Sequence, residues 1–111
     1  MKFNHFLTSY MPDPSIGSKL HFKNMIDQSI LAEQLKYASV SIPEHHLVNL
    51  LMMPSPLQMA VKIATLTEKI KIVSSVAVLP LHDMRTYAGE VAIADILTDG
   101  RLILGVGRGA F

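Results

Sequence analysis

The fold is decided by residues 70–109, which read IKIVSSVAVLPLHDMRTYAGEVAIADILTDGRLILGVGRG. Residues 70–79 are rich in Val and Ile and nearly free of charge, which is typical of a strand buried on both faces. Asp83 can cap a helix that runs to about Leu97, and a Thr-Asp-Gly turn at residues 98–100 closes it. Residues 101–106 then form another strand. This order predicts two parallel strands joined by a right-handed crossover.

The same alternation extends back to the N-terminus. Strands are predicted at residues 2–7, 39–42, 70–79 and 101–106. Helices are predicted between them, at about residues 21–38, 56–68 and 84–97, with Ser55 as the cap of the second. The chain, residues 1–111, is therefore predicted to be a single α/β domain of order β-α-β-α-β-α-β. Two architectures fit this order: a doubly wound open sheet and part of an eight-fold β/α barrel.

Composition limits the classes of function. Half of the residues are hydrophobic and 17% are charged, which indicates either apolar faces that the chain does not cover by itself or a well-filled core. The net charge is +1, with Lys and Arg scattered, so no nucleic-acid surface is predicted. The absence of cysteine excludes disulfides and thiolate metal sites. No stretch approaches the length of a membrane span, and a soluble, cytoplasmic protein is predicted.

Chemically versatile residues follow each predicted strand. They are Thr8-Ser9-Tyr10, Glu44-His45-His46, His82-Asp83 and Gly105-Val106-Gly107-Arg108-Gly109. The carboxyl ends of parallel strands meet at one edge of a sheet, where ligands bind in α/β folds. These four loops are therefore expected to converge on one candidate site.

Within these loops, the histidines and Arg108 are the sharpest candidates. A histidine beside a carboxylate, as in Glu44-His45-His46, can transfer protons near neutral pH. The same side chains with His82 are plausible metal ligands, but the helical pair spacing of zinc enzymes is missing, and no metal site is predicted. Arg108, between two glycines at a strand end, is well placed to meet an anionic or electron-rich ligand.

Taken together, these motifs resemble the N-terminal half of the bacterial-luciferase-like flavin-dependent monooxygenases. The resemblance covers nearly the whole chain. Its landmarks are Met1-Lys2-Phe3, Pro43-Glu44-His45-His46, Pro54-Ser55-Pro56, Val78-Leu79-Pro80-Leu81-His82, and Asp99-Gly100-Arg101 leading into Gly105-Val106-Gly107-Arg108-Gly109.

The resemblance implies the N-terminal half of a (β/α)8 TIM-type barrel and an enzyme that uses reduced FMN, or F420 as an alternative, with O2 to oxidise a small organic substrate. By position, His45 corresponds to the family's active-site histidine, with Glu44 beside it to orient it. Ser75 and Val76 correspond to the segment that lies against the isoalloxazine ring. Arg108 corresponds to the arginine that contacts the flavin.

The resemblance also indicates what the chain lacks. The later strands, which hold the flavin phosphate and complete the substrate pocket in this family, are absent, so the enzyme is expected to be truncated and inactive alone. Four strands leave two apolar edges, which predicts a homodimer or pairing with a missing second half. Two alternatives stay open: a non-catalytic flavin-binding or subunit-interaction fragment that dimerises through these edges, and a metal-dependent hydrolase half-barrel.

Overall fold

The computed structural model describes residues 1–110, and its strands and helices follow the predicted order. The strands are β1 (Asn4–Phe6), β2 (Ser39–Ile42), β3 (Lys71–Val78) and β4 (Leu102–Gly107). The α-helices are α1 (Ser18–Gln34), α2 (Pro56–Leu66) and α3 (Met84–Leu97), and single 3-10 turns form η1 (Pro14–Ile16) and η2 (Leu79–Leu81). Within this part of the chain, no helix has both the length and the apolar character needed to cross a membrane.

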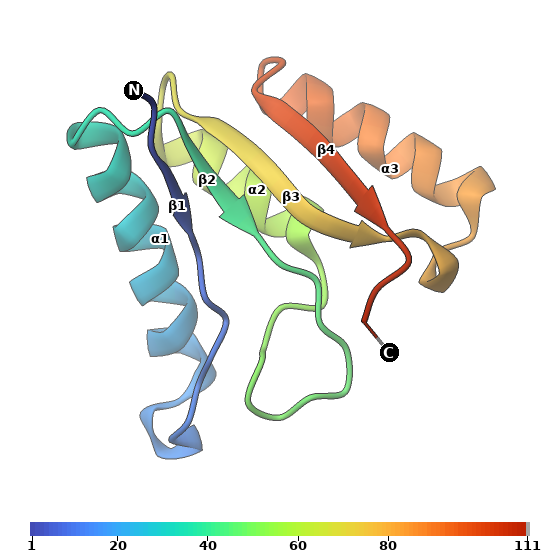
Figure 1. Cartoon of the computed structure of the whole chain (residues 1–111), viewed down its shortest axis with the longest axis horizontal. Coiled ribbons are helices and arrows are strands. Elements are labelled where there is room, and N and C mark those ends of the chain that lie inside the picture. The colour runs from blue at the N-terminus through green and yellow to red at the C-terminus, as the bar shows by residue number, and fades with distance from the viewer. Residues whose placement is uncertain (111) are drawn as a thin grey trace.

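The sheet decides between the two architectures that the sequence left open. Its strands are all parallel and follow the order β1-β2-β3-β4. The helices lie together on one side of this curved sheet, with α2 packed between α1 and α3 (Figure 1). A doubly wound sheet would reverse its strand order and carry helices on both faces. The arrangement is that of consecutive β/α units of a barrel, and the predicted half of a (β/α)8 barrel is confirmed.

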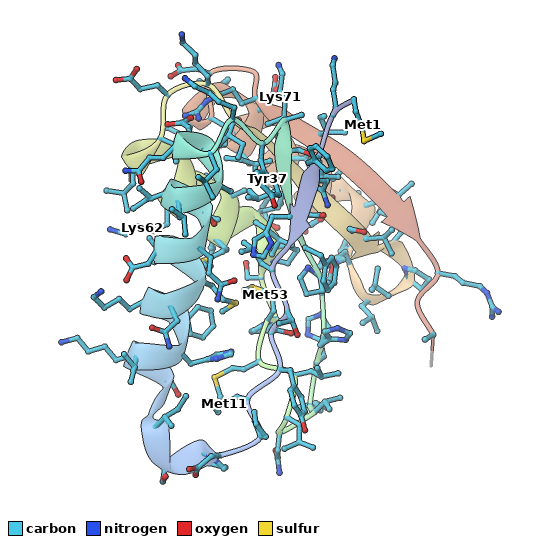
Figure 2. The ribbon with its side chains drawn as sticks, turned by 60° about the vertical axis from the view of Figure 1, so that its left-hand side comes forward. Met1, Met11, Tyr37, Met53, Lys62 and Lys71 are labelled. Atoms are coloured by element: carbon cyan, nitrogen blue, oxygen red, sulfur yellow. The ribbon has the colours of Figure 1, made fainter. Side chains whose placement is uncertain are left out.

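The core lies between the helices and the helix-facing side of the sheet. Alternate strand residues such as Val40, Ile42 and Ile72 are fully buried there, as the two-residue repeat of a strand requires. They pack against Met25 of α1 and Ile63 of α2. Figure 2 shows the layer of side chains between α1 and the strands, with the buried Met53 among them.

A buried arginine fixes the start of β4. The guanidinium of Arg101 donates hydrogen bonds to the Ala64 carbonyl oxygen at 2.7 Å, the Thr67 hydroxyl at 2.9 Å and the Thr98 carbonyl oxygen at 3.1 Å. These acceptors lie at the carboxyl ends of α2 and α3, where free carbonyl groups and the helix dipole favour a cation. Arg101 therefore ties both helices to the first residue of the predicted strand.

Strand β4 extends through Gly107, one residue beyond the predicted strand, so Gly105 and Gly107 lie in the strand and Arg108 and Gly109 follow it. The β3–β4 register shifts between Ser74 and Ala77, and the Ser75–Val76 peptide is cis. Across this irregularity, the Ser74 hydroxyl accepts from the Gly105 amide and donates to the Gly105 carbonyl, both at 3.0 Å. A Cβ on Gly105 would lie 2.3 Å from the Ser74 carbonyl oxygen, and one on Gly107 would lie 2.9 Å from Val76. The glycines therefore permit the close approach of β3.

The helix starts agree only in part with the predicted caps. Asp83 caps α3 as predicted, since its carboxylate accepts from the Arg85 amide at 3.0 Å. Ser55 occupies the corresponding position of α2, but its side chain makes no capping hydrogen bond. Helix α1 begins at Ser18, earlier than predicted, because Gly17, with a φ of 83°, turns the chain directly into the helix.

Candidate functional site

A hollow of about 480 Å³ lies at the carboxyl ends of the strands. Its walls are Phe6, residues 43–48, Ser75, Val76, Val78, Leu81, Gly109 and Ala110. The segments that follow β2, β3 and β4 thus meet at one place, as the sequence predicted. The contribution of β1 differs from the prediction, since it comes from Phe6 and not from Thr8-Ser9-Tyr10. We take this hollow as the candidate site.

Glu44 is the polar centre of the hollow, and its side chain is fully buried. One carboxylate oxygen, Oε1, accepts from His46 Nε2 at 2.6 Å and from His82 Nε2 at 2.7 Å. The other, Oε2, accepts from the Val78 amide at 2.9 Å. Glu44 therefore connects the loop after β2 to the end of β3 and to the segment that follows it.

These hydrogen bonds keep Glu44 ionised. Burial by itself would raise the pKa of Glu44, because the charged form loses its hydration. The hydrogen bonds from His46, the Val78 amide and His82 outweigh burial and lower the pKa below its ordinary value. The site thus holds a buried carboxylate whose negative charge is compensated by three donors.

The predicted pairing of Glu44 with His45 is corrected by the structure. The segment is extended at His45, whose amide donates to the Met53 carbonyl oxygen at 2.8 Å in an antiparallel bridge. In extended backbone, neighbouring side chains point to opposite sides and every second one shares a side. Glu44 therefore contacts His46, two residues on. His45 lines the hollow independently of this carboxylate.

His82 is held from a second direction by Tyr87 of α3. The two rings stack with centroids 4.0 Å apart and an interplanar angle of 21°. Tyr87 is buried and its hydroxyl lacks a hydrogen-bond partner within residues 1–110. Burial, followed by the negative charges of Glu44 and Glu90, raises the pKa of this phenol. Tyr87 therefore acts as an apolar support for the His82 ring.

The residues predicted to bind a cofactor do not all line the hollow. Ser75 and Val76 line the hollow, with Ser75 exposed and Val76 half-buried. Arg108 is exposed at the end of β4 and does not belong to the described lining, although its neighbour Gly109 does. The lining within residues 1–110 contains neither Lys nor Arg. Contact between Arg108 and a ligand stays a prediction.

The structure also brings together three possible metal ligands, although the sequence predicted no metal site. Ligand atoms of Glu44, His46 and His82 all lie within 4.8 Å of one another. The sequence had named these residues among four plausible ligands, and His45 is the one that stays outside the cluster. The involvement of His82 was signalled only by its place after β3.

A second hollow, of about 540 Å³, lies between α2 and α3. Its walls are mainly apolar, with Leu57, Val61 and Ile93 among them, and its charged group is Glu90. It lies on the helix side of the sheet and has no histidine in its described lining. It therefore lacks the chemistry of the hollow at the strand ends.

Comparison with known protein families identifies the family of this chain. A family model described as luciferase-like monooxygenase matches residues 1–111. The chain belongs to this family. The flavin-dependent trigonelline monooxygenase, oxygenase component, of Acinetobacter baylyi is 27% identical over the whole chain. The protein y4vJ of Sinorhizobium fredii is 36% identical over 98% of the chain.

Solved structures show the same fold. The oxygenating constituent of 3,6-diketocamphane monooxygenase from Pseudomonas putida, in complex with FMN, superimposes on the whole chain with a TM-score of 0.92 at 24% identity. Monooxygenase RslO1 of Streptomyces bottropensis superimposes on 99% of the chain with a TM-score of 0.90, also at 24% identity. The chain spans 31% of the length of both sequence relatives and 30% and 34% of these two structures.

Proposed function

We propose that this chain supplies the flavin-facing strand ends of a luciferase-like monooxygenase that uses reduced FMN and O2 to oxidise a small organic substrate. The observation that carries the proposal is the convergence of His45, Glu44, Ser75 and Val76 on one hollow at the carboxyl ends of parallel strands. Membership of the family and the flavin-dependent relative of Acinetobacter baylyi support it.

The chemistry of the hollow fits the ring of a flavin better than its phosphate. Its volume of about 480 Å³ lies in the range of small-molecule sites, and Phe6, Val76 and Val78 give it apolar walls. A flat aromatic ring system needs such walls together with a few polar groups, which His45 and His46 provide. With no cation in the described lining, the phosphate would need Arg108 or residues beyond this chain.

The proposed roles follow from these positions. When bound, reduced flavin supplies the electrons with which O2 is activated for transfer of one oxygen atom to the substrate. Ser75 and Val76 form the wall against which the ring would lie. His45 is half-buried in the hollow and can hold or release a proton there. Glu44 acts through His46 and His82, which it positions.

Flavin binding by the chain tests the proposal. We expect saturable quenching of FMN fluorescence on titration with the protein, and tighter binding of FMN than of F420. Ser75→Trp should weaken binding at least tenfold, because the indole would fill the hollow. The matched control Ser15→Trp, on exposed η1, should bind like the wild type. Lack of saturable FMN binding by the wild type would overturn the proposal. Tighter binding of F420 than of FMN would show that the cofactor is F420.

A second candidate function rests on the open edge of the sheet. Strand β4 pairs with β3 alone among the described strands, and its residues Ile103, Leu104 and Val106 are 39 to 50% exposed. An apolar edge of this kind favours pairing with another chain. The chain would then serve as a non-catalytic subunit-interaction module. A stable dimer by light scattering, without any flavin binding, would favour this function over the first.

A further inference from the structure

Two imidazoles share one carboxylate oxygen of Glu44. His46 Nε2 and His82 Nε2 lie 2.6 Å and 2.7 Å from Glu44 Oε1, and their ring centroids are 6.4 Å apart. Such separations are those of short hydrogen bonds to an ionised group. The Val78 amide occupies Oε2 of the same carboxylate, so the whole group is fixed in orientation.

An ionised carboxylate only accepts hydrogen bonds. Each imidazole must therefore present a proton at Nε2 to Glu44. A neutral imidazole carries one proton, so both neutral rings take the Nε2–H tautomer, and Nδ1 becomes the basic atom of each. No residue within 1–110 forms a hydrogen bond to Nδ1 of either ring.

We propose that Glu44 is a positioning residue that holds His46 and His82 in the Nε2–H tautomer, so that Nδ1 of His46 is a second proton-accepting atom at the hollow. The tautomer is a property of this chain alone. The use of that atom toward a bound ligand rests on the proposed function.

The imidazole rings of His46 and His82 differ in solvent exposure. His46 lines the hollow, and 34% of its side chain is exposed. His82 is 21% exposed, is stacked on Tyr87 and does not line the hollow. His46 is therefore the ring with access to a ligand, and His82 completes the compensation of the Glu44 charge. The arrangement parallels a catalytic triad, in which a buried carboxylate fixes the tautomer of the histidine that takes the proton.

Glu44, His46 and His82 could instead be arranged to bind a metal ion, but the distances between their nitrogen and oxygen atoms favour direct hydrogen bonds. In a tetrahedral site with metal–nitrogen bonds of about 2.0–2.1 Å, two ligand atoms lie roughly 3.3 Å apart. The two Nε2–Oε1 separations here are 2.6 Å and 2.7 Å, which match a direct N–H···O contact. Metal-bound histidines also generally donate their second ring nitrogen to a carboxylate, carbonyl or water, and no described residue does this for either ring.

The test is nitrogen-15 NMR of the histidine side chains of the full chain at pH about 8, above the ordinary imidazole pKa of about 6.5. Variants His46→Gln and His82→Gln assign the two rings. We expect both rings to carry a proton on Nε2 in the wild type. Glu44→Gln should give a population with the proton on Nδ1 alone, because the amide nitrogen of glutamine can donate to Nε2. His5, whose Nε2 lies 2.9 Å from the neutral Gln28 amide oxygen, is the internal control and should not change.

A proton on Nδ1 alone in either wild-type ring would overturn the proposal, and this result does not require that any variant folds. Stoichiometric binding of Zn²⁺ through both Nε2 atoms would also overturn it. Addition of FMN separates the two proposals. If FMN binds, a shift of His46 Nδ1 with His5 unchanged supports the role at the hollow, and no shift overturns that role. If FMN does not bind, the proposed function fails. The tautomers of His46 and His82, measured without FMN, still show whether Glu44 positions the two rings.

Discussion

Glu44 and Val78 join the segment after β2 to the end of β3, which is far away in the sequence, through a hydrogen bond of 2.9 Å between Glu44 Oε2 and the Val78 amide. Val78 is the last residue of β3, where the sheet ends and the hollow begins. The buried carboxylate therefore satisfies the amide of the last residue of β3. This contact makes Glu44 a structural element of the site as well as a part of its chemistry.

Replacement of Glu44 by Ala should lower the free energy of unfolding. The substitution leaves the Val78 amide and two imidazole donors without their acceptor, and an unsatisfied buried donor costs about 1–3 kcal/mol. Urea unfolding followed by circular dichroism measures the change. Glu68→Ala, at an exposed position, serves as the control and should stay within about 0.5 kcal/mol of the wild type. Equal stabilities for the two variants would contradict the role of Glu44.

Glu33 should make stability depend on pH. Burial alone would raise the pKa of Glu33, but hydrogen bonds from the backbone amides of Lys69, Ile70 and Glu68, with the charge of Arg101, lower it from the ordinary value of 4.5. A carboxyl whose pKa is lower in the folded state stabilises the protein above its unfolded pKa. That stabilisation disappears as the pH falls through the lowered folded value.

The wild type should therefore exceed Glu33→Gln in free energy of unfolding near neutral pH, and the difference should shrink as the pH falls below about 4.5. Urea unfolding of both proteins between pH 3 and pH 7 measures this dependence. A difference that stays constant over the range would contradict the prediction, because it would show that the three amides interact equally well with the protonated and the ionised carboxyl of Glu33.

The strands and helices could be predicted because their signals are local. The β-branched run of β3, the prolines at 43 and 56 and the Asp83 cap act within a few residues of themselves. The order of the strands could not be predicted from this alternation, since a doubly wound sheet shares it. Which side of the sheet each helix covers depends on contacts between distant residues, and only the family resemblance favoured the barrel.

The sequence predicts which loops form the candidate site, but it does not predict which side chains are in contact there. Glu44 is adjacent to His45 in the sequence, but extended backbone turns these two side chains apart and brings Glu44 to His46. His82 lies 38 residues further on and reaches the same oxygen only because parallel strands end together. The close approach of β3 to Gly105 and Gly107 could not be predicted either, because the contacting residues are far apart in the sequence.

The open edge of β4 should promote association of the chain. Val106 is 50% exposed on this edge, and a lysine there would disfavour pairing with another strand, because its charge would have to be desolvated. We expect wild-type mass by light scattering to rise with protein concentration and Val106→Lys to shift it toward the monomer. Leu31→Lys, at a similarly exposed apolar site on α1, is the control and should associate like the wild type. Equal masses for Val106→Lys and the wild type would show that association does not occur through this edge.

Two glycines should respond oppositely to the same substitution. In Gly105→Ala the added Cβ would lie 2.3 Å from the Ser74 carbonyl oxygen, so β3 and β4 must separate. Overpacking of this kind costs typically about 1–3 kcal/mol, and the displaced Ser74 hydroxyl bonds add to the loss. In α3, a Cβ on Gly89 meets no atom within 4 Å in residues 1–110 apart from its chain neighbours and the adjacent backbone of its own helix, so Gly89→Ala should stabilise the protein by about 0.5–1 kcal/mol. Urea unfolding of both variants measures the difference. Tolerance of Ala at position 105 would show that the close approach of β3 to β4 does not require glycine.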